Sequence, residues 1–326
     1  MFCLTKRNEV LKSVVLRLAL LLILSLALIA DPGCETTPSI STPLLPSGFT
    51  DALVPDVNLD GYLYLNQSSP VVISSDLMTA TGPQISIRSA QLFLGPDTDS
   101  IGGSVSFQSQ ADAQLAVQLM KSITVPLWSL ANGNEIYAAN TDSGEWTSSL
   151  KNAFSQQQMV NPSAKFPDTR EDFAYFPSNP PSKPIVAGFV NTTGNLVDSI
   201  GTRTELSLTD YTSVLKSAGI SRISFVVYCA QPITISSKTL SEAYIDSLQV
   251  SALAIGRSSY PSIAVSAFFD TAMESAGFTK YTINNVDVFE YPLGSAEMAA
   301  GHKGNVIYVA ASPSKDLVEK LLLSCF

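Results

Sequence analysis

Apolar and polar residues follow two different periods along this chain, and together the two periods predict a mixed α+β fold. Around Ile85 and Ile87, apolar residues alternate with polar neighbours, which is the two-residue period of a half-buried strand. Around Leu115 and Leu119, apolar residues four positions apart share one stripe, which is the period of an amphipathic helix. By the same reasoning we expect further strands at 62–65, 104–107, 127–131, 135–139, 185–190, 222–229, 246–256, 262–269, 281–291 and 305–311. Of these, 246–256 and 262–269 are expected to form a hairpin, and the stretch 281–291 to contain a turn at Asn284-Asn285.

Capping residues and turn dipeptides mark the ends of several expected elements. Asp270 is expected to cap a short helix that ends at Gly277, and Ser312 is expected to cap the last helix. Asn132-Gly133 lies between two short strand patterns and predicts a tight hairpin turn. Asp97 precedes another turn, where its carboxylate is expected to accept hydrogen bonds from nearby backbone N–H groups.

Composition shifts divide the chain into five segments. Residues 1–34 are a signal or anchor segment, and the Ser/Thr/Pro-rich residues 35–50 are a tether with too few bulky side chains to fold alone. Two α+β units follow, at 51–154 and 184–326. Proline density marks residues 155–183 between them as a linker, because each proline fixes φ and removes a backbone donor.

The two units share short sequence matches, which predict an internal duplication. In each unit we expect antiparallel sheet covered by helices, because hairpins alternate with helical segments. The matches pair 92–95 with 253–256, 105–106 with 265–266, and 132–137 with 284–289.

The start of the chain has the anatomy of an export signal. Basic residues, including Lys12 and Arg17, precede an uncharged apolar run at 18–30, and a polar stretch follows it. The run is short for a membrane-spanning helix, which needs roughly 20 apolar residues.

The apolar run is followed by Gly33-Cys34 and a Ser/Thr/Pro-rich stretch, and this start resembles that of bacterial envelope lipoproteins. The resemblance implies lipidation of Cys34, attachment to a membrane through the N-terminus, and a body in the cell envelope that faces the extracytoplasmic side. Two alternatives stay open, because Asp31 and Pro32 stand where that family has an apolar and a small residue: an uncleaved anchor helix and ordinary cleavage.

The charge balance argues against one class of partner. The chain has 19 basic and 28 acidic residues, and removing the four basic and two acidic residues of the first 34 positions leaves a net charge of −11. Nucleic-acid binding draws most of its affinity from neutralising phosphates with basic side chains, so we expect no nucleic-acid partner. The ligand, whether a protein or a small molecule, is not indicated by the sequence.

The cysteines fit an exported protein. If Cys34 carries lipid, Cys229 and Cys325 are left as a pair, and a disulfide between them would close a long loop. The alternative is two buried thiols.

One stretch resembles a metal loop. Asp56, Asn58 and Asp60 place oxygen ligands at alternate positions before Gly61, as in the calcium loops of EF-hand and dockerin proteins. The resemblance makes these three residues a calcium candidate, although Gln67 stands where those families have a bidentate carboxylate. The alternative is an acidic turn that leads into a strand, and no other cofactor is indicated.

Catalytic patterns are weak. His302 is the only histidine, and it is expected as an exposed turn residue. Asp168, Glu171 and Asp172 lie in the proline-rich stretch and are expected to be solvated. The sequence therefore favours a membrane-anchored, extracytoplasmic binding or structural protein without enzymatic activity. The alternative is an exported hydrolase that uses an unrecognised carboxylate site.

Overall fold

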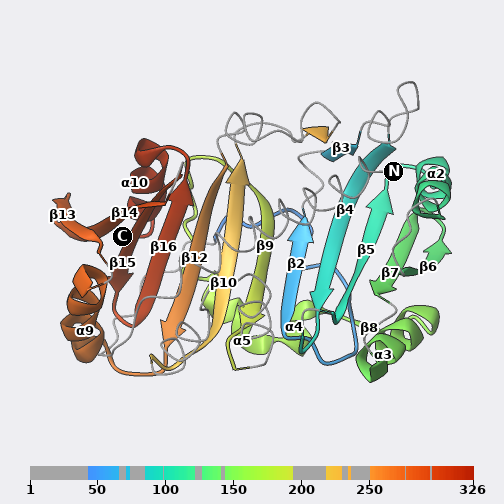
Figure 1. The fold of residues 1–326 in the computed structure, drawn as a ribbon, viewed down its shortest axis with the longest axis horizontal. Helices are drawn as coiled ribbons and strands as arrows, with labels where there is room; N and C mark the ends of the chain where they lie inside the picture. Colours follow the sequence, from blue (N-terminus) through green and yellow to red (C-terminus); the bar gives the residue numbers. More distant parts are fainter. Residues whose placement is uncertain are drawn as a thin grey trace, which may run out of the picture.

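The computed structural model describes residues 43–65, 71–73, 85–97, 99–121, 127–140, 144–193, 218–229, 234–235, 250–275, 277–293 and 296–326. These residues form one long sheet with helices packed on it (Figure 1). Most of its fourteen strands follow the order β13-β14-β15-β16-β12-β10-β9-β2-β4-β5-β7-β6, while β3 attaches to β4 and β11 attaches to β3. Neighbouring strands along this order are antiparallel, which agrees with the expected α+β class.

The first half of the chain supplies one end of the sheet and two of the covering helices. Its elements are β1 (Val54–Pro55), β2 (Gly61–Leu65), β3 (Val71–Ile73), β4 (Ile85–Leu94), β5 (Ile101–Phe107), α2 (Gln110–Lys121), β6 (Leu127–Asn132), β7 (Glu135–Asn140) and α3 (Gly144–Ser155).

A short connecting region and the second half follow. The connecting elements are β8 (Met159–Val160), α4 (Pro162–Lys165) and α5 (Pro167–Phe173). The second half contains β9 (Lys183–Asn191), β10 (Ile220–Cys229), β11 (Thr234–Ile235), β12 (Ser251–Ser258), α9 (Ser262–Ser275), β13 (Thr279–Ile283), β14 (Val286–Leu293), β15 (Ala296–Lys303), β16 (Val306–Ser312) and α10 (Lys315–Leu323).

The two halves meet at the centre of the sheet, where β2 pairs antiparallel with β9. From that pair outward, each half has the same order along the chain. Three neighbouring strands (β2, β4, β5 or β9, β10, β12) are followed by a helix (α2 or α9), a hairpin (β6–β7 or β15–β16) and a second helix (α3 or α10). The hairpin β13–β14 extends the second half beyond this shared order.

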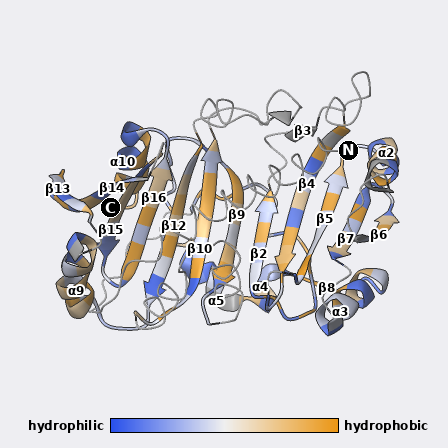
Figure 2. Ribbon diagram, viewed as in Figure 1, coloured by the Kyte–Doolittle hydropathy of each residue, from blue (hydrophilic) through white to orange (hydrophobic). Residues whose placement is uncertain are grey.

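Side chains from successive strand positions pack on opposite faces of the sheet. In β10, Phe225 and Val227 belong to a core with Phe269 of α9, whereas Val226 and Tyr228 belong to a core with Leu321 of α10. The α10 face also carries α3 and the connecting region, and on the α9 face α2 covers a smaller cluster with β4, β5 and β7. Strands β10, β12 and β16 are largely apolar in Figure 2, because both of their faces are covered.

The expected hairpin over 246–256 and 262–269 is wrong in its second strand. Residues Ser262–Ser275 form α9, and Asp270 lies inside this helix rather than at its start. The buried residues of α9 are Val265, Phe269 and Met273, which are four positions apart and so face one side of a helix. Four-residue spacing also satisfies a two-residue period, and for this reason the local pattern was ambiguous.

The sequence matches between the units pair segments that form different elements in the structure. Val105 lies in β5, whereas its match Val265 lies in α9. A tight turn joins β6 to β7 as predicted, but its two turn residues are Gly133 and Asn134, because Asn132 still belongs to β6. The matching Asn284-Asn285 joins β13 to β14, which lies outside the shared order. In the order of elements along the chain, the hairpin that corresponds to β6–β7 is β15–β16.

The expected start of the last helix is displaced by two residues. The N-cap position of α10 is Ser314, not Ser312, and the hydroxyl of Ser312 accepts a hydrogen bond from the backbone N–H of Ser314 at 3.3 Å. The spacing of Tyr211, Leu215 and Ala218 also predicts a helix, and residues 211–217 lie outside the described residues.

The proline-rich segment 155–183 packs against the sheet. Strand β8 pairs with β1, and Phe166, Phe173 and Phe176 are all buried. The ring of Phe173 contacts that of Phe49 edge-on at 4.8 Å between centroids, and Phe166 contacts Phe189 of β9 at 4.7 Å. The segment therefore covers the central strands of the sheet.

Within the part of the chain that the structure describes, none of the helices has the length and apolar character needed to cross a membrane. The apolar run 18–30 and Cys34 lie outside the described residues.

Candidate functional site

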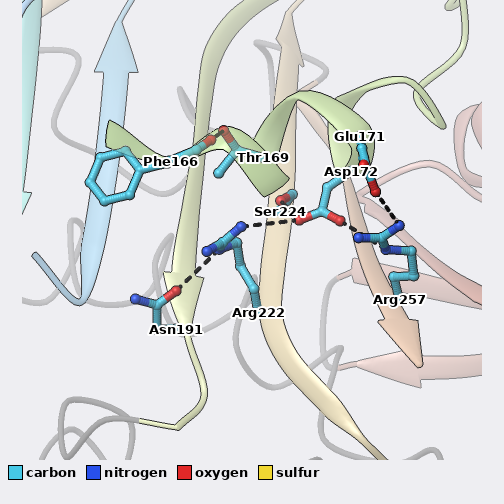
Figure 3. Close-up of polar contacts among 8 residues, drawn as sticks. All are labelled: Phe166, Thr169, Glu171, Asp172, Asn191, Arg222, Ser224 and Arg257. Carbon is cyan, nitrogen blue, oxygen red and sulfur yellow. Dashed lines mark hydrogen bonds and ion pairs between the residues drawn. The ribbon is translucent and has the colours of Figure 1, made fainter. Parts of the chain in front are cut away.

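A cluster of charged side chains lies where α5 crosses the central strands of the second half (Figure 3). Asp172 comes from α5, Arg222 from β10 and Arg257 from the neighbouring strand β12. The register of β10 against β12 shifts between Ile220 and Ile223, and this irregularity lies at the position of Arg222. Asp172, Ser221, Arg222 and Arg257 line a small open pocket.

Asp172 is the centre of the cluster. Its carboxylate lies between two guanidinium groups, with Oδ2 at 3.6 Å from Nη1 of Arg222 and Oδ1 at 3.4 Å from Nε of Arg257. The hydroxyl of Ser224 donates to Oδ2 at 3.4 Å. Only 10% of the Asp172 side chain is exposed, so these partners replace water that the carboxylate has lost.

Arg222 is held from three sides. Its Nε donates to Oδ1 of Asn191 in β9 at 3.1 Å, and its guanidinium carbon lies 5.1 Å from the ring centre of Phe189. With the Asp172 ion pair, these contacts fix the plane of the guanidinium group.

Arg257 is the more accessible arginine. Its Nη1 donates to Oε2 of Glu171 at 2.6 Å, and the Glu171 side chain is 65% exposed. Burial lowers the pKa of Arg257, but the hydrogen bond that Arg257 donates to Glu171 and the charges of Asp172 and Glu171 raise it by more, so the net pKa of Arg257 lies above its usual value. Arg257 is therefore positively charged over the whole physiological pH range.

The geometry suits recognition of an oxyanion. Two arginines on neighbouring strands line one pocket, and a guanidinium group can bind a carboxylate or phosphate through two parallel N–H donors. Glu171 is the exposed partner of Arg257, so an incoming anion would replace it at little cost in desolvation.

Sequence reasoning missed this site. Asp172 was expected to be solvated but is buried, because α5 packs on the sheet and places it over both arginines. Arg222 and Arg257 are far apart in the sequence and have no local motif. Only the pairing of β10 with β12 brings them together.

The three calcium candidates contact three different parts of the structure. Asp56 pairs with Lys165 of α4 at 3.0 Å, and the backbone carbonyl of Asn58 accepts a hydrogen bond from the indole of Trp146 at 2.7 Å. Burial raises the pKa of Asp60, and a hydrogen bond with Asn191 opposes that rise.

Calcium binding by these residues stays a prediction. Gln67, the expected twelfth ligand position, lies outside the described residues. Among the described His, Cys, Asp and Glu side chains, no group of three or more is arranged to hold a metal ion.

The expected disulfide is wrong. Cys229 and Cys325 are not joined in the structure. They belong to different cores, because Cys229 packs on the α9 face of the sheet and Cys325 packs against the core on the α10 face. Burial raises the pKa of the Cys325 thiol to about 12, which keeps it protonated.

His302 is not the expected exposed turn residue. It lies in β15, and its ring contacts that of Phe269 edge-on at 4.9 Å. Burial lowers its pKa, and its Nδ1 is buried without a hydrogen-bond partner among the described residues.

Comparison with known proteins finds a similar solved structure but no matching family. No protein-family model matches the chain, and no curated protein matches it. One solved structure, titled "Structure of crystal form I of TP0453", is similar with a TM-score of 0.38 and 7% sequence identity, over 87% of this chain and 99% of that chain.

Proposed function

We propose that this protein is a membrane-anchored, extracytoplasmic binding protein without enzymatic activity, and that it binds ligands bearing an oxyanion at Arg222 and Arg257. The observation that carries the proposal is that both guanidinium groups line one pocket at the centre of the sheet. The pocket lies beside β9, the strand through which the two halves of the chain meet. Binding sites favour such junctions.

The same geometry favours binding over acid–base catalysis at this site. A general acid must hold a proton near neutral pH. Asp172 lies between two positively charged groups, and a nearby opposite charge favours the ionised carboxylate. Asp172 therefore serves as the fixed counter-ion that aligns both arginines.

The experiment titrates the full-length protein in detergent with sodium phosphate and, separately, sodium benzoate, and records thermal unfolding. Ligand at ten times its Kd is expected to stabilise the protein by about 1.4 kcal/mol. Arg222→Gln and Arg257→Gln should each abolish the ligand-induced shift, measured against the same variant without ligand. Arg88→Gln, an exposed cation on β4, is the control and should keep it.

A second variant tests whether Arg257 binds the anion directly or only supports the fold. Glu171→Gln removes the exposed carboxylate that competes for Arg257, so it should bind the anion more tightly than the unchanged protein. An equal shift in Arg257→Gln and the unchanged protein, or no shift in the latter, would refute the oxyanion site.

Membrane anchoring is supported by the sequence of the first 34 residues alone. Intact mass of the protein extracted from bacterial membranes tests it. A mass that corresponds to a chain starting at a lipidated Cys34 supports a lipoprotein, and an unmodified full-length mass instead makes the apolar run a permanent anchor.

We also propose that the two halves arose by internal duplication. The support is their shared order of strands and helices around the central β2–β9 pair. On this proposal, β13–β14 is an addition to the second half.

The second candidate function, an exported hydrolase, is favoured by one observation. Glu319 of α10 has a raised pKa, caused first by burial and then by the hydrogen bond and charge of Glu290. Lys315 forms ion pairs with both carboxylates. Paired carboxylates of this kind can serve as acid and base. Hydrolysis of p-nitrophenyl esters or glycosides that Glu319→Gln abolishes would support this candidate over the first.

A further inference from the structure

Strand β6 forms one end of the long sheet, and no other described strand pairs with its outer edge. Among the described strands its single neighbour is β7. The closing pair of this hairpin is Asn132 with Glu135, and hydrogen-bonded pairs alternate from there along the strand. The backbone N–H and C=O groups of Leu127, Ser129 and Ala131 therefore point away from β7.

The sequence of β6 itself lacks the features that usually prevent edge pairing. Its residues are Leu-Trp-Ser-Leu-Ala-Asn, with no charge and no proline. Charged side chains and prolines are the common means by which natural edge strands avoid pairing with another chain.

The opposite end of the sheet is protected. Strand β13 carries Lys280 at its second position, and Lys280 forms ion pairs with Asp270 at 2.5 Å and with Asp287 at 2.9 Å. Pairing another strand against β13 would bring these charged groups to the new contact. The β13 edge is therefore charged, whereas the residues of β6 are not.

The β6 edge is complementary to itself. In an antiparallel pair of two β6 strands related by a two-fold axis at Ser129, Ser129 faces its own copy and Leu127 faces Ala131. Trp128 then faces Leu130 of the other copy, and it does so at the closer, non-hydrogen-bonded positions. This register forms about six backbone hydrogen bonds.

Trp128 and Leu130 supply the apolar part of this contact. Both pack on the α3 face of the sheet, and both are only half-buried in the single chain. The ring of Trp128 already stacks on Phe154 of α3 at 6.3 Å between centroids, so its position is fixed before pairing. Two copies would place four such side chains side by side and cover their remaining exposed surface.

We propose that the protein forms a symmetric dimer through β6, in which the sheets of two copies become one continuous sheet. The partner is a second copy of this chain. Two copies of the chain repel each other in most orientations, because each carries a net charge of −9. Strand β6 itself is neutral, so association is directed to this edge.

The test uses the full-length protein in detergent and measures its mass by sedimentation across a concentration series. The unchanged protein should be dimeric. Ser129 is exposed, and a lysine there would face its own copy across the two-fold axis. Ser129→Lys and Ser129→Glu should each weaken the dimer about fivefold or more, because like charges lie directly opposite each other.

An equimolar mixture of the two variants provides the decisive measurement. It should restore the dimer, because lysine then faces glutamate, and far-UV circular dichroism should show that each variant alone is folded. The control Thr279→Lys places the same charge on the β13 edge, where the residue is exposed, and should leave the dimer unchanged.

Three outcomes would overturn the proposal. These are a monomeric unchanged protein, a Ser129→Lys variant as dimeric as the unchanged protein, and a mixture that stays monomeric. The second outcome would show that association occurs elsewhere, for example through the apolar N-terminal run.

Discussion

At the scale of single residues, His302 makes the stability of the folded protein depend on pH. Burial is the largest cause of its lowered pKa, and the charge of Lys280 adds to it, while a hydrogen bond with the backbone of Gly304 and the charges of Asp270 and Asp287 act in the opposite direction. The unfolded chain therefore binds a proton at this site more readily than the folded chain does. Below the ordinary pKa of about 6.5, protonation favours the unfolded state, so stability is lost as pH falls through that value.

We expect His302→Phe to flatten the dependence of stability on pH below about 6.5, where the unfolded chain binds a proton at this site more readily than the folded chain. The phenylalanine keeps the ring contact with Phe269 and removes both the titration and the unpartnered Nδ1. The effect amounts to about 1.4 kcal/mol for each pH unit by which the folded and unfolded pKa values differ. Urea unfolding at several pH values measures it.

The chain has one histidine, which makes the result interpretable. The control Arg88→Gln should retain the slope of the unchanged protein. An identical slope in His302→Phe and the unchanged protein would contradict the assignment.

Local chemistry was predictable for residues whose partners are close in the sequence. Asp97 accepts hydrogen bonds from the backbone N–H groups of Asp99 at 2.9 Å and Ser100 at 2.8 Å, as its turn position predicted. Asp172 has partners on two distant strands, and its sequence neighbours gave no sign of them. Candidate sites built across strands depend on register, which a single sequence does not specify.

At the scale of elements, the proline-rich segment is part of the core. Its prolines predicted a linker, yet Pro167 is the first residue of α5, where a proline's fixed φ suits helix initiation. The better indicator was the spacing of Phe166, Phe173 and Phe176, which are all buried. Bulky aromatic residues in a proline-rich stretch supply the apolar surface that a free linker lacks.

We expect Phe173→Ala to destabilise the protein by about 3–4 kcal/mol, because it removes a buried ring that contacts Phe49 and Phe176. Loss of this contact should also loosen α5 and so expose residues 155–183 to limited proteolysis. Urea unfolding and proteolysis with mass spectrometry measure the two effects.

Phe268→Ala is the matched control, because Phe268 lies on α9 and is 42% exposed. It should cost less than about 1 kcal/mol and leave the cleavage pattern unchanged. Equal effects of the two substitutions would show that the segment contributes no more than a surface helix does.

At the scale of the whole molecule, two halves that resemble separate units in the sequence share one sheet. Individual strands were predictable from periodicity, and the turn between β6 and β7 was predictable from its Asn-Gly dipeptide, since both signals are local. The junction was not, because nothing in β2 or β9 alone specifies that they pair with each other. The register of that pair places Gly188 opposite Leu63, and the two backbones approach closely there.

Gly188→Ala tests whether this junction makes the molecule unfold as one unit. A Cβ at Gly188 would lie 2.3 Å from the carbonyl oxygen of Tyr62 and 3.0 Å from the Cα of Leu63, so β2 and β9 would have to separate. We expect a loss of about 3 kcal/mol or more, because the crowding is against backbone that cannot rotate away. In Gly256→Ala, the matched control, the new Cβ meets side-chain carbons of Ile220 at 3.1 Å, and a flexible side chain can adjust.

Two probes distinguish a weakened junction from general destabilisation. Both tryptophans, Trp128 and Trp146, lie in the first half, so their fluorescence reports that half, whereas far-UV circular dichroism reports the whole chain. The two urea transitions should coincide in the unchanged protein and in Gly256→Ala, and separate in Gly188→Ala. Coincident transitions in Gly188→Ala, with a stability equal to that of Gly256→Ala, would show that the central strand pair does not couple the halves.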